Sequence, residues 1–273
     1  MRRVCAVIAV LAAVPAAAPA FAQDELDKVW TKIQPARGVY TLRQRGGERG
    51  SDAASLSGRL IIEARVTCDE MATSMTMELR ATSGAQTMTV TLEQKTTESR
   101  DGKVYRFGSR TLENGRETEN REGQAVLQSR NGPGEAKIKG SAAEDVKIEA
   151  GTILPATLLL RTLAEATAGK PSFEARVFYG FDQIKIAQVR VTIKGAGRSG
   201  KEKGLGEFAD KPGWTIHQEH KEVGGQPDSQ AQATEMFITE DAIATSIVLQ
   251  VQNLELVGTP LSIEKLPKPE CKN

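Results

Sequence analysis

Apolar side chains recur at every second position over much of this chain, and this period restricts the fold more than any other feature. From Leu56 to Cys68 every even position is apolar or glycine, and similar alternation runs through 71–79, 88–92 and 173–179. Successive side chains of a β-strand point to opposite faces, so a period of two predicts strands with one buried face. The first of these strands would carry Cys68 on its buried face.

Turn-forming pairs separate the alternating runs in the first half of the chain. Ser83-Gly84, Asp101-Gly102, Asn114-Gly115 and Glu122-Gly123 each stand between two short runs. Asp-Gly and Asn-Gly are the strongest short hairpin signals, so we expect a long antiparallel meander. Further strands are expected around 189–193, 236–238, 243–249 and 254–266, with polar loops at 195–211 and 223–231.

Two segments have helical spacing instead. The segment Asp24–Ile33 places apolar residues three and four apart and ends before Pro35. A second helix, 156–168, begins after Pro155 and ends before Gly169, which is the usual polarity of these two residues around a helix. The sequence therefore predicts a mainly β domain with a many-stranded antiparallel sheet, one central helix and a short N-terminal helix.

The N-terminus has the pattern of a secretory signal peptide. Arg2 and Arg3 precede an apolar run that ends in the small-x-small pattern of Ala20 and Ala22. We expect cleavage after Ala22, which would leave residues 23–273 as a single exported domain. A transmembrane anchor is the alternative, but the run is short and rich in alanine and proline.

The charge balance of the mature chain restricts its partners. Removing Arg2 and Arg3 leaves 34 basic residues against 35 acidic ones. Nucleic-acid binding relies on a strongly basic surface, so a general nucleic-acid partner is excluded. The mature chain has no apolar stretch long enough to span a bilayer.

Two cysteines remain after signal cleavage, Cys68 and Cys271. Two cysteines in an exported protein usually pair, so we expect a disulfide that fastens the C-terminal tail to an early strand. Two free thiols are the alternative, which an oxidising compartment disfavours.

Several residue patterns could indicate a site for chemistry, and for most of them a structural role is the better interpretation. The glycines of 195–200 match G-x-G-x-x-G, but no helix pattern follows, so a hairpin loop is the better interpretation. His217 and His220 would point to opposite faces of one strand, which does not suit a shared metal. No nucleophile motif is present, although a carboxylate pair stays possible. We therefore predict no catalytic residue, metal or cofactor.

Methionines offer one possible binding feature. Met71, Met75, Met77 and Met88 could line a lipid-binding cavity, because methionine adapts to irregular apolar ligands. An ordinary packed core is the alternative.

Several segments, taken in order along the chain, point to one known family. They are Ala36–Leu42, Gly58–Leu60 leading to Cys68, Asp101–Phe107, Leu154–Thr157, Val177–Gly180, Leu256–Leu261 and the terminal Cys271. The order of these segments and the placement of the two cysteines resemble the EipB family of periplasmic cell-envelope integrity proteins, which implies that the exported chain resides in the periplasm.

This resemblance implies a β-spiral, a curled open sheet like those of periplasmic lipoprotein carriers, with a disulfide between Cys68 and Cys271. It also implies a role in outer-membrane and envelope integrity. Our hypothesis is a non-catalytic protein that fulfils this role as a scaffold or binding module for an envelope protein or an acylated ligand. A soluble carrier of lipid or lipoprotein is the alternative. An envelope hydrolase would require convergent polar groups with perturbed pKa values in a cleft.

Overall fold

A computed structural model of the chain describes residues 23–46, 55–181, 185–224, 232–251 and 254–271. The predicted signal peptide, residues 1–22, lies outside the described residues, as does most of the predicted loop 223–231.

The described chain consists of one long sheet with few helices. Helix α1 (Gln23–Lys32) comes first, α2 (Pro155–Thr167) lies between β9 and β10, and the 3-10 helix η1 (Lys203–Phe208) lies between β11 and β12. The strands are β1 (Ala36–Arg45), β2 (Ser55–Val66), β3 (Glu70–Ser83), β4 (Gln86–Ser99), β5 (Val104–Glu113), β6 (Arg116–Leu127), β7 (Gly134–Gly140), β8 (Glu144–Ile148), β9 (Thr152–Ile153), β10 (Ser172–Phe178), β11 (Ile186–Arg198), β12 (Pro212–Glu222), β13 (Gln232–Thr239), β14 (Ala244–Val251) and β15 (Leu254–Lys265).

All 15 strands belong to a single sheet, in the order β8-β7-β6-β5-β4-β3-β2-β1-β15-β14-β13-β12-β11-β10-β9. The pairing of β1 with β15 is antiparallel and joins the two halves of the chain, with Ala36 opposite Lys265. Every neighbouring pair is antiparallel except β9 with β10. The predicted antiparallel meander is confirmed, and it continues beyond the first half of the chain.

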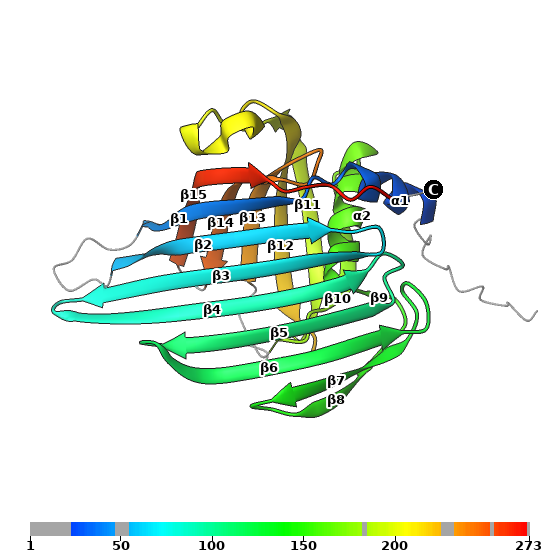
Figure 1. Cartoon of the computed structure of the whole chain (residues 1–273), viewed down its shortest axis with the longest axis horizontal. Helices are drawn as coiled ribbons and strands as arrows, with labels where there is room; N and C mark the ends of the chain where they lie inside the picture. Colours follow the sequence, from blue (N-terminus) through cyan, green and yellow to red (C-terminus); the bar gives the residue numbers. More distant parts are fainter. Residues whose placement is uncertain (1–22, 47–54, 182–184, 225–231, 252–253, 272–273) are drawn as a thin grey trace, which may run out of the picture.

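The sheet curls until its two ends approach each other. Figure 1 shows β1 to β8 stacked in front, with β10 to β14 behind them at a steep angle. Tyr105 and Phe107 of β5 pack with Phe178 of β10, and Ile148 of β8 and Leu154 belong to the same buried cluster. The many-stranded curled sheet implied by the family resemblance is therefore confirmed, and it is more nearly closed than the open sheet that was expected.

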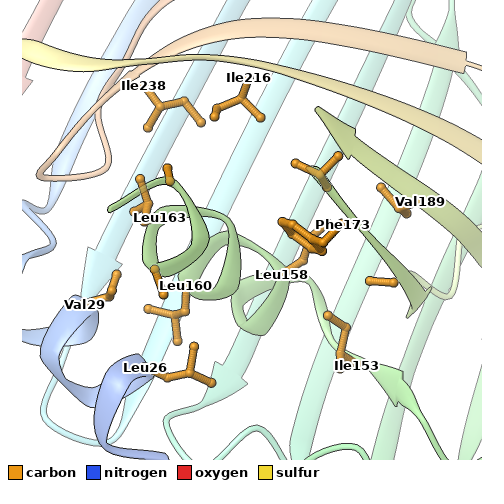
Figure 2. Packing of buried hydrophobic residues seen from close by; sticks show 14 of the residues in the cluster. Leu26, Val29, Ile153, Leu158, Leu160, Leu163, Phe173, Val189, Ile216 and Ile238 are labelled. Atoms are coloured by element: carbon orange, nitrogen blue, oxygen red, sulfur yellow. The ribbon is translucent and has the colours of Figure 1, made fainter. Parts of the chain in front are cut away.

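Helix α2 fills part of the concave side of this sheet. Figure 2 shows Leu160 and Leu163 of α2 beside Leu26 and Val29 of α1, with strand residues including Ile216 around them. The predicted helices 24–33 and 156–168 are both confirmed within one residue of their expected bounds. Their apolar residues form one continuous core with β10 to β13.

Two predicted turns or loops are wrong. Gly123 lies inside β6 and not in a turn, and a Cβ there would come within 2.5 Å of the Phe107 ring. In the predicted loop 195–211, β11 continues to Arg198 and η1 follows. Leu205 and Phe208 are buried together with Ile263 of β15, and this apolar contact orders the segment.

The predicted disulfide is present, but Cys68 is not in a strand. Cys68 and Cys271 are joined with their Cα atoms 5.5 Å apart. Strand β2 ends at Val66, and the Thr67 hydroxyl then accepts hydrogen bonds from the backbone N–H groups of Asp69 and Glu70. This local turn chemistry places Cys68 in a partly exposed bend between β2 and β3.

Candidate functional site

A carboxylate from a distant strand caps the N-terminus of α2. The backbone amides in the first turn of a helix have no partner within the helix, and Leu154 offers no capping side chain. Glu98 of β4 accepts hydrogen bonds from the Ala156 N–H at 2.6 Å and the Thr157 N–H at 2.9 Å. The Thr157 hydroxyl donates to the same carboxylate at 2.6 Å. Glu98 is 3% exposed, so the helix start is fixed to the sheet by a buried group.

Burial dominates the electrostatics of Glu98. Removal of its carboxylate from water raises the pKa to about 7, although the donors on Thr157 and Ala156 act in the opposite direction. Arg130 lies close enough to favour the ionised form as well. Burial in turn lowers the pKa of the Arg130 guanidinium.

The turn between β4 and β5 forms hydrogen bonds with α1 and with the disulfide-bonded Cys68. Arg100 Nε donates to Asp27 Oδ1 of α1 at 2.9 Å, and its Nη1 lies 3.5 Å from the Cys68 carbonyl. Arg130 Nε donates to the Asp101 carbonyl at 3.2 Å. We call this region, with α1, α2, the disulfide and the β4–β5 turn, the closed end. Figure 1 shows the C-terminal segment, in red, ending beside α1.

A cavity of about 300 Å³ lies on the concave face, between the inner side of β2 to β5 and the start of α2. This volume is at the small end of the usual range for small-molecule sites. Its lining is mostly apolar, and the described lining residues include no lysine or arginine. They are Ile62, Met71, Thr73, Met75, Gln94, Thr96, Glu98, Tyr105, Pro155, Ala156, Leu159, Tyr179 and Phe181.

Uncharged polar side chains occupy one wall of the cavity. Thr73 is paired with Thr96 across β3 and β4, and Met75 is paired with Gln94. Paired residues of antiparallel strands share a face, so all of them face inward with the rest of the lining. We call Thr73, Gln94 and Thr96 the polar row.

The same inner face becomes wholly apolar beyond the cavity. Met77 is paired with Leu92 and Leu79 with Val90, and all four are half-buried. We call these four residues the apolar row. It ends near Met88, which is 46% exposed, close to the turn at Gly84. We call this end of β3 and β4 the open end.

The methionines predicted as a possible lipid-binding cluster are divided among three environments. Met71 is buried in the core around α2, and it also lines the cavity with Met75. Met75 and Met77 pack against the buried cluster of Tyr40, Leu42, Leu60 and Ile247. Met88 is exposed. The methionines therefore contribute to a core and to a cavity wall, and lipid binding stays a prediction.

A chain of polar contacts leads from the cavity to one of the two histidines. The Tyr105 hydroxyl donates to the Tyr179 carbonyl at 3.3 Å, and the Tyr179 hydroxyl lies 3.2 Å from His220 Nδ1. Burial lowers the pKa of His220 to about 4 and raises the pKa of both tyrosines. His220 is therefore a neutral, packed residue at neutral pH.

The second histidine points away from this chain of contacts. His217 lies within 4 Å of Glu219 and Glu235 on the other face of β12, as its position in the strand predicts. In the described ranges, no group of three or more His, Cys, Asp or Glu residues is gathered closely enough to hold a metal.

The cavity contains a carboxyl group with a perturbed pKa, that of Glu98, and an envelope hydrolase would require such a group. Glu98 pairs with a hydroxyl, that of Thr157. Thr157 is buried and is absent from the described cavity lining. A substrate in the cavity would therefore not reach this hydroxyl, and both oxygens of Glu98 are engaged in holding α2. The geometry favours a structural role for this pair.

A larger hollow of about 650 Å³ opens between α1, the end of α2 and the β11–β12 hairpin. It is lined by Trp214, several apolar residues and charged residues of both signs, among them Lys32 and Glu240. It has no counterpart of the polar row on the concave face. We therefore take the smaller cavity as the candidate site.

Family membership is decided by a match that spans most of the chain. Residues 28–267 match the model of the EipB-like family. This chain belongs to the EipB-like family. The resemblance to this family is confirmed, while a search of curated proteins gives no match.

The fold has a counterpart among solved structures. The chain is similar to the crystal structure of a beta-barrel-like protein of the domain of unknown function DUF1849 from Brucella abortus, with a TM-score of 0.78 and 17% sequence identity. The match covers 86% of this chain and 99% of the other. At this identity the likeness concerns the fold alone. Family and fold are consistent with a periplasmic, envelope-associated protein, and no helix among the described residues is long and apolar enough to cross a membrane.

Sequence reasoning missed Glu98, Gln94 and Thr96, although a signal was present. Met88, Val90 and Leu92 begin an apolar alternation on the even positions, and Gln94, Thr96 and Glu98 continue it with polar residues. A change from apolar to polar on one face of a strand marks a place where that face meets something other than a dry core.

Proposed function

We propose that this EipB-like protein is a non-catalytic binding module of the periplasm that supports cell-envelope integrity. The observation that carries the proposal is the cavity and the half-exposed apolar row that leads away from it. An apolar segment of a lipid or of an acylated partner would bury the row on binding. Removing apolar surface from water is the main driving force of such association.

The compartment is supported by independent features of the chain. The sequence has a signal-peptide pattern, and the disulfide between Cys68 and Cys271 suits an oxidising compartment. The EipB-like family is a family of periplasmic proteins. The absence of catalysis is supported by the engagement of Glu98 as a helix cap.

A soluble carrier of lipid or lipoprotein is the second candidate. It is favoured by one specific feature, the continuation of the inner apolar surface to exposed Met88 at the open end. A carrier must take up and release its cargo, and an apolar surface that reaches solvent offers a route. A scaffold would instead keep its partner in place.

The test is complementation of a deletion strain in the native bacterium. Deletion should sensitise cells to detergent and to large antibiotics that an intact outer membrane excludes. Thr96→Trp fills the cavity and should fail to restore resistance. Thr97→Trp is the matched control, because Thr97 lies on the opposite face of the same strand, and it should restore resistance fully.

Two results would contradict the proposal. One is a deletion strain with unchanged sensitivity to detergent and antibiotics. The other is full complementation by Thr96→Trp, provided that both variants accumulate in the periplasm to the level of the wild-type protein.

A further inference from the structure

The polar row has hydrogen-bonding capacity that the protein itself does not use. The side chains of Thr73, Gln94 and Thr96 take part in no hydrogen bond within the described part of the chain. All three are half-buried on the inner face. Polar groups in such positions cost stability unless they find a partner, whether water or a ligand.

The polar row is uncharged and can both donate and accept hydrogen bonds. The Gln94 amide has two N–H donors and a carbonyl acceptor, and each threonine hydroxyl both donates and accepts. The row therefore matches a ligand group that carries carbonyl and hydroxyl or amide functions side by side.

The charges around the cavity disfavour an anion. None of the described lining residues is a lysine or arginine, and one of them, Glu98, has a carboxyl group. Glu98 is paired with Met71, and this pair is the next one on the inner face after Thr73 and Thr96. A carboxylate or phosphate placed against the row would lose its hydration and gain no opposite charge.

We infer that the cavity binds the neutral ester or amide linkage of an acyl chain at the polar row, with the hydrocarbon lying along Met77, Leu79, Val90 and Leu92. The order of the side chains along β3 and β4 sets this direction. Polar residues lie nearest the closed end, and apolar residues lead to the open end. The small cavity volume, about 300 Å³, suits the linkage region of one chain. This inference rests on the proposed binding function and specifies its ligand class.

Selectivity between ligands follows from the cost of leaving a buried polar group without a hydrogen bond. A site built to hydrogen-bond a substrate group discriminates strongly against an analogue that lacks it, because its own polar atoms are left unpaired. An acylglycerol supplies both a carbonyl and hydroxyls without charge. A fatty acid of equal length supplies a carboxylate, which is ionised at neutral pH.

The test compares two probes, monolauroylglycerol and laurate, by titration of the mature, disulfide-bonded protein below the micelle concentration of each. We expect monolauroylglycerol to bind at least about tenfold more tightly than laurate. The double variant Gln94→Leu, Thr96→Val should lose this preference by weakening monolauroylglycerol about tenfold. Thr97→Val on the outer face is the matched control and should behave as wild type.

Each contrary outcome has a distinct meaning. Equal affinity of the wild-type protein for both probes would overturn the inference, as would an unchanged preference in the double variant; the proposed binding function would survive either result. If wild type bound neither amphiphile, then the inference and the use of this cavity for apolar ligands would both be wrong. The wild-type comparison decides the matter even if the double variant does not fold.

Discussion

The closed end and the open end lie at opposite ends of the same two strands, β3 and β4, yet their inward-facing side chains differ in burial and in hydrogen bonding. At the closed end, Glu98 is 3% exposed and accepts three hydrogen bonds, and Met71 is buried against the helices. At the open end, Leu79 and Val90 face inward but are only half-buried. The two ends differ in what covers the inner face.

This difference indicates that the residues that stabilise the fold and the residues that could bind a ligand lie at different ends of these strands. A helix core, a disulfide and a buried cap hold the closed end, and each is costly to remove. The apolar row at the open end contributes less burial to the fold and leaves surface for a ligand. Substitutions at the two ends should therefore separate into those that weaken folding and those that weaken ligand uptake.

Removal of the disulfide should have the largest effect on stability. The double variant Cys68→Ser, Cys271→Ser opens a loop of 203 residues, for which the chain-entropy model gives at most about 5 kcal/mol. Denaturant unfolding of the variant should match that of reduced wild type. A loss below about 1 kcal/mol would mean that the C-terminal tail is held mainly by its other contacts.

Loss of the α2 cap should rank second. Glu98→Ala leaves two backbone amides and the Thr157 hydroxyl without their acceptor, and we expect a loss of about 3 kcal/mol in the free energy of unfolding. Glu93→Ala is the matched control on the outer face, where Glu93 forms a partly exposed ion pair with Arg110. It should cost less than about 1 kcal/mol. Equal losses in the two variants would contradict the distinction between a buried carboxylate that caps a helix and a carboxylate on the outer face.

Two buried groups should give stability opposite pH dependences. The pKa of Glu98 is raised from 4.5 to about 7, so its contribution is complete below pH 4.5 and is lost as pH rises through 7. The pKa of His220 is lowered from 6.5 to about 4, so its contribution is present above pH 6.5 and is lost as pH falls through 4. Each contribution is of the order of 3 kcal/mol.

Unfolding curves of Glu98→Gln and His220→Gln across this pH range test both signs. The first variant should lose less stability than wild type as pH rises from 4.5 to 7. The second should lose less as pH falls from 6.5 to 4. Reversed slopes would show that the burial of these groups does not control their ionisation.

Substitution at the open end should have the smallest effect on folding. Leu79→Ser shortens a half-buried side chain of the apolar row, and we expect a loss of about 1 kcal/mol or less in unfolding free energy. Binding of monolauroylglycerol should fall several-fold, because the hydrocarbon loses part of its contact surface. A large loss of stability without a change in binding would place Leu79 in the core and not in the site.

The sequence predicted the elements more reliably than the way in which they join. The period of two identified most strands, and Pro155 with Gly169 located α2, because these signals depend on neighbouring residues. Strands β7 to β9 were missed, since in β7 only Ala136 and Ile138 are large enough to mark a buried face. The pairing of β1 with β15 joins Ala36 to Lys265 and has no local signal.

The site was predicted only in part for the same reason. The methionines suggested an apolar cavity, and Cys68 with Cys271 suggested the disulfide. Glu98 was not identified, because its partners Ala156 and Thr157 lie almost sixty residues away along the chain. Likewise, nothing local indicated that Gln94 and Thr96 would face a cavity formed with α2.

The most direct test of the account is native mass spectrometry of the mature protein, purified from periplasm without detergent. We expect a reproducible extra mass on the wild-type protein, released as an acylated compound and absent from Thr96→Trp but present on Thr97→Trp. A bare disulfide-bonded chain that also stays bare after incubation with monolauroylglycerol would contradict the claim that the concave face is a binding site.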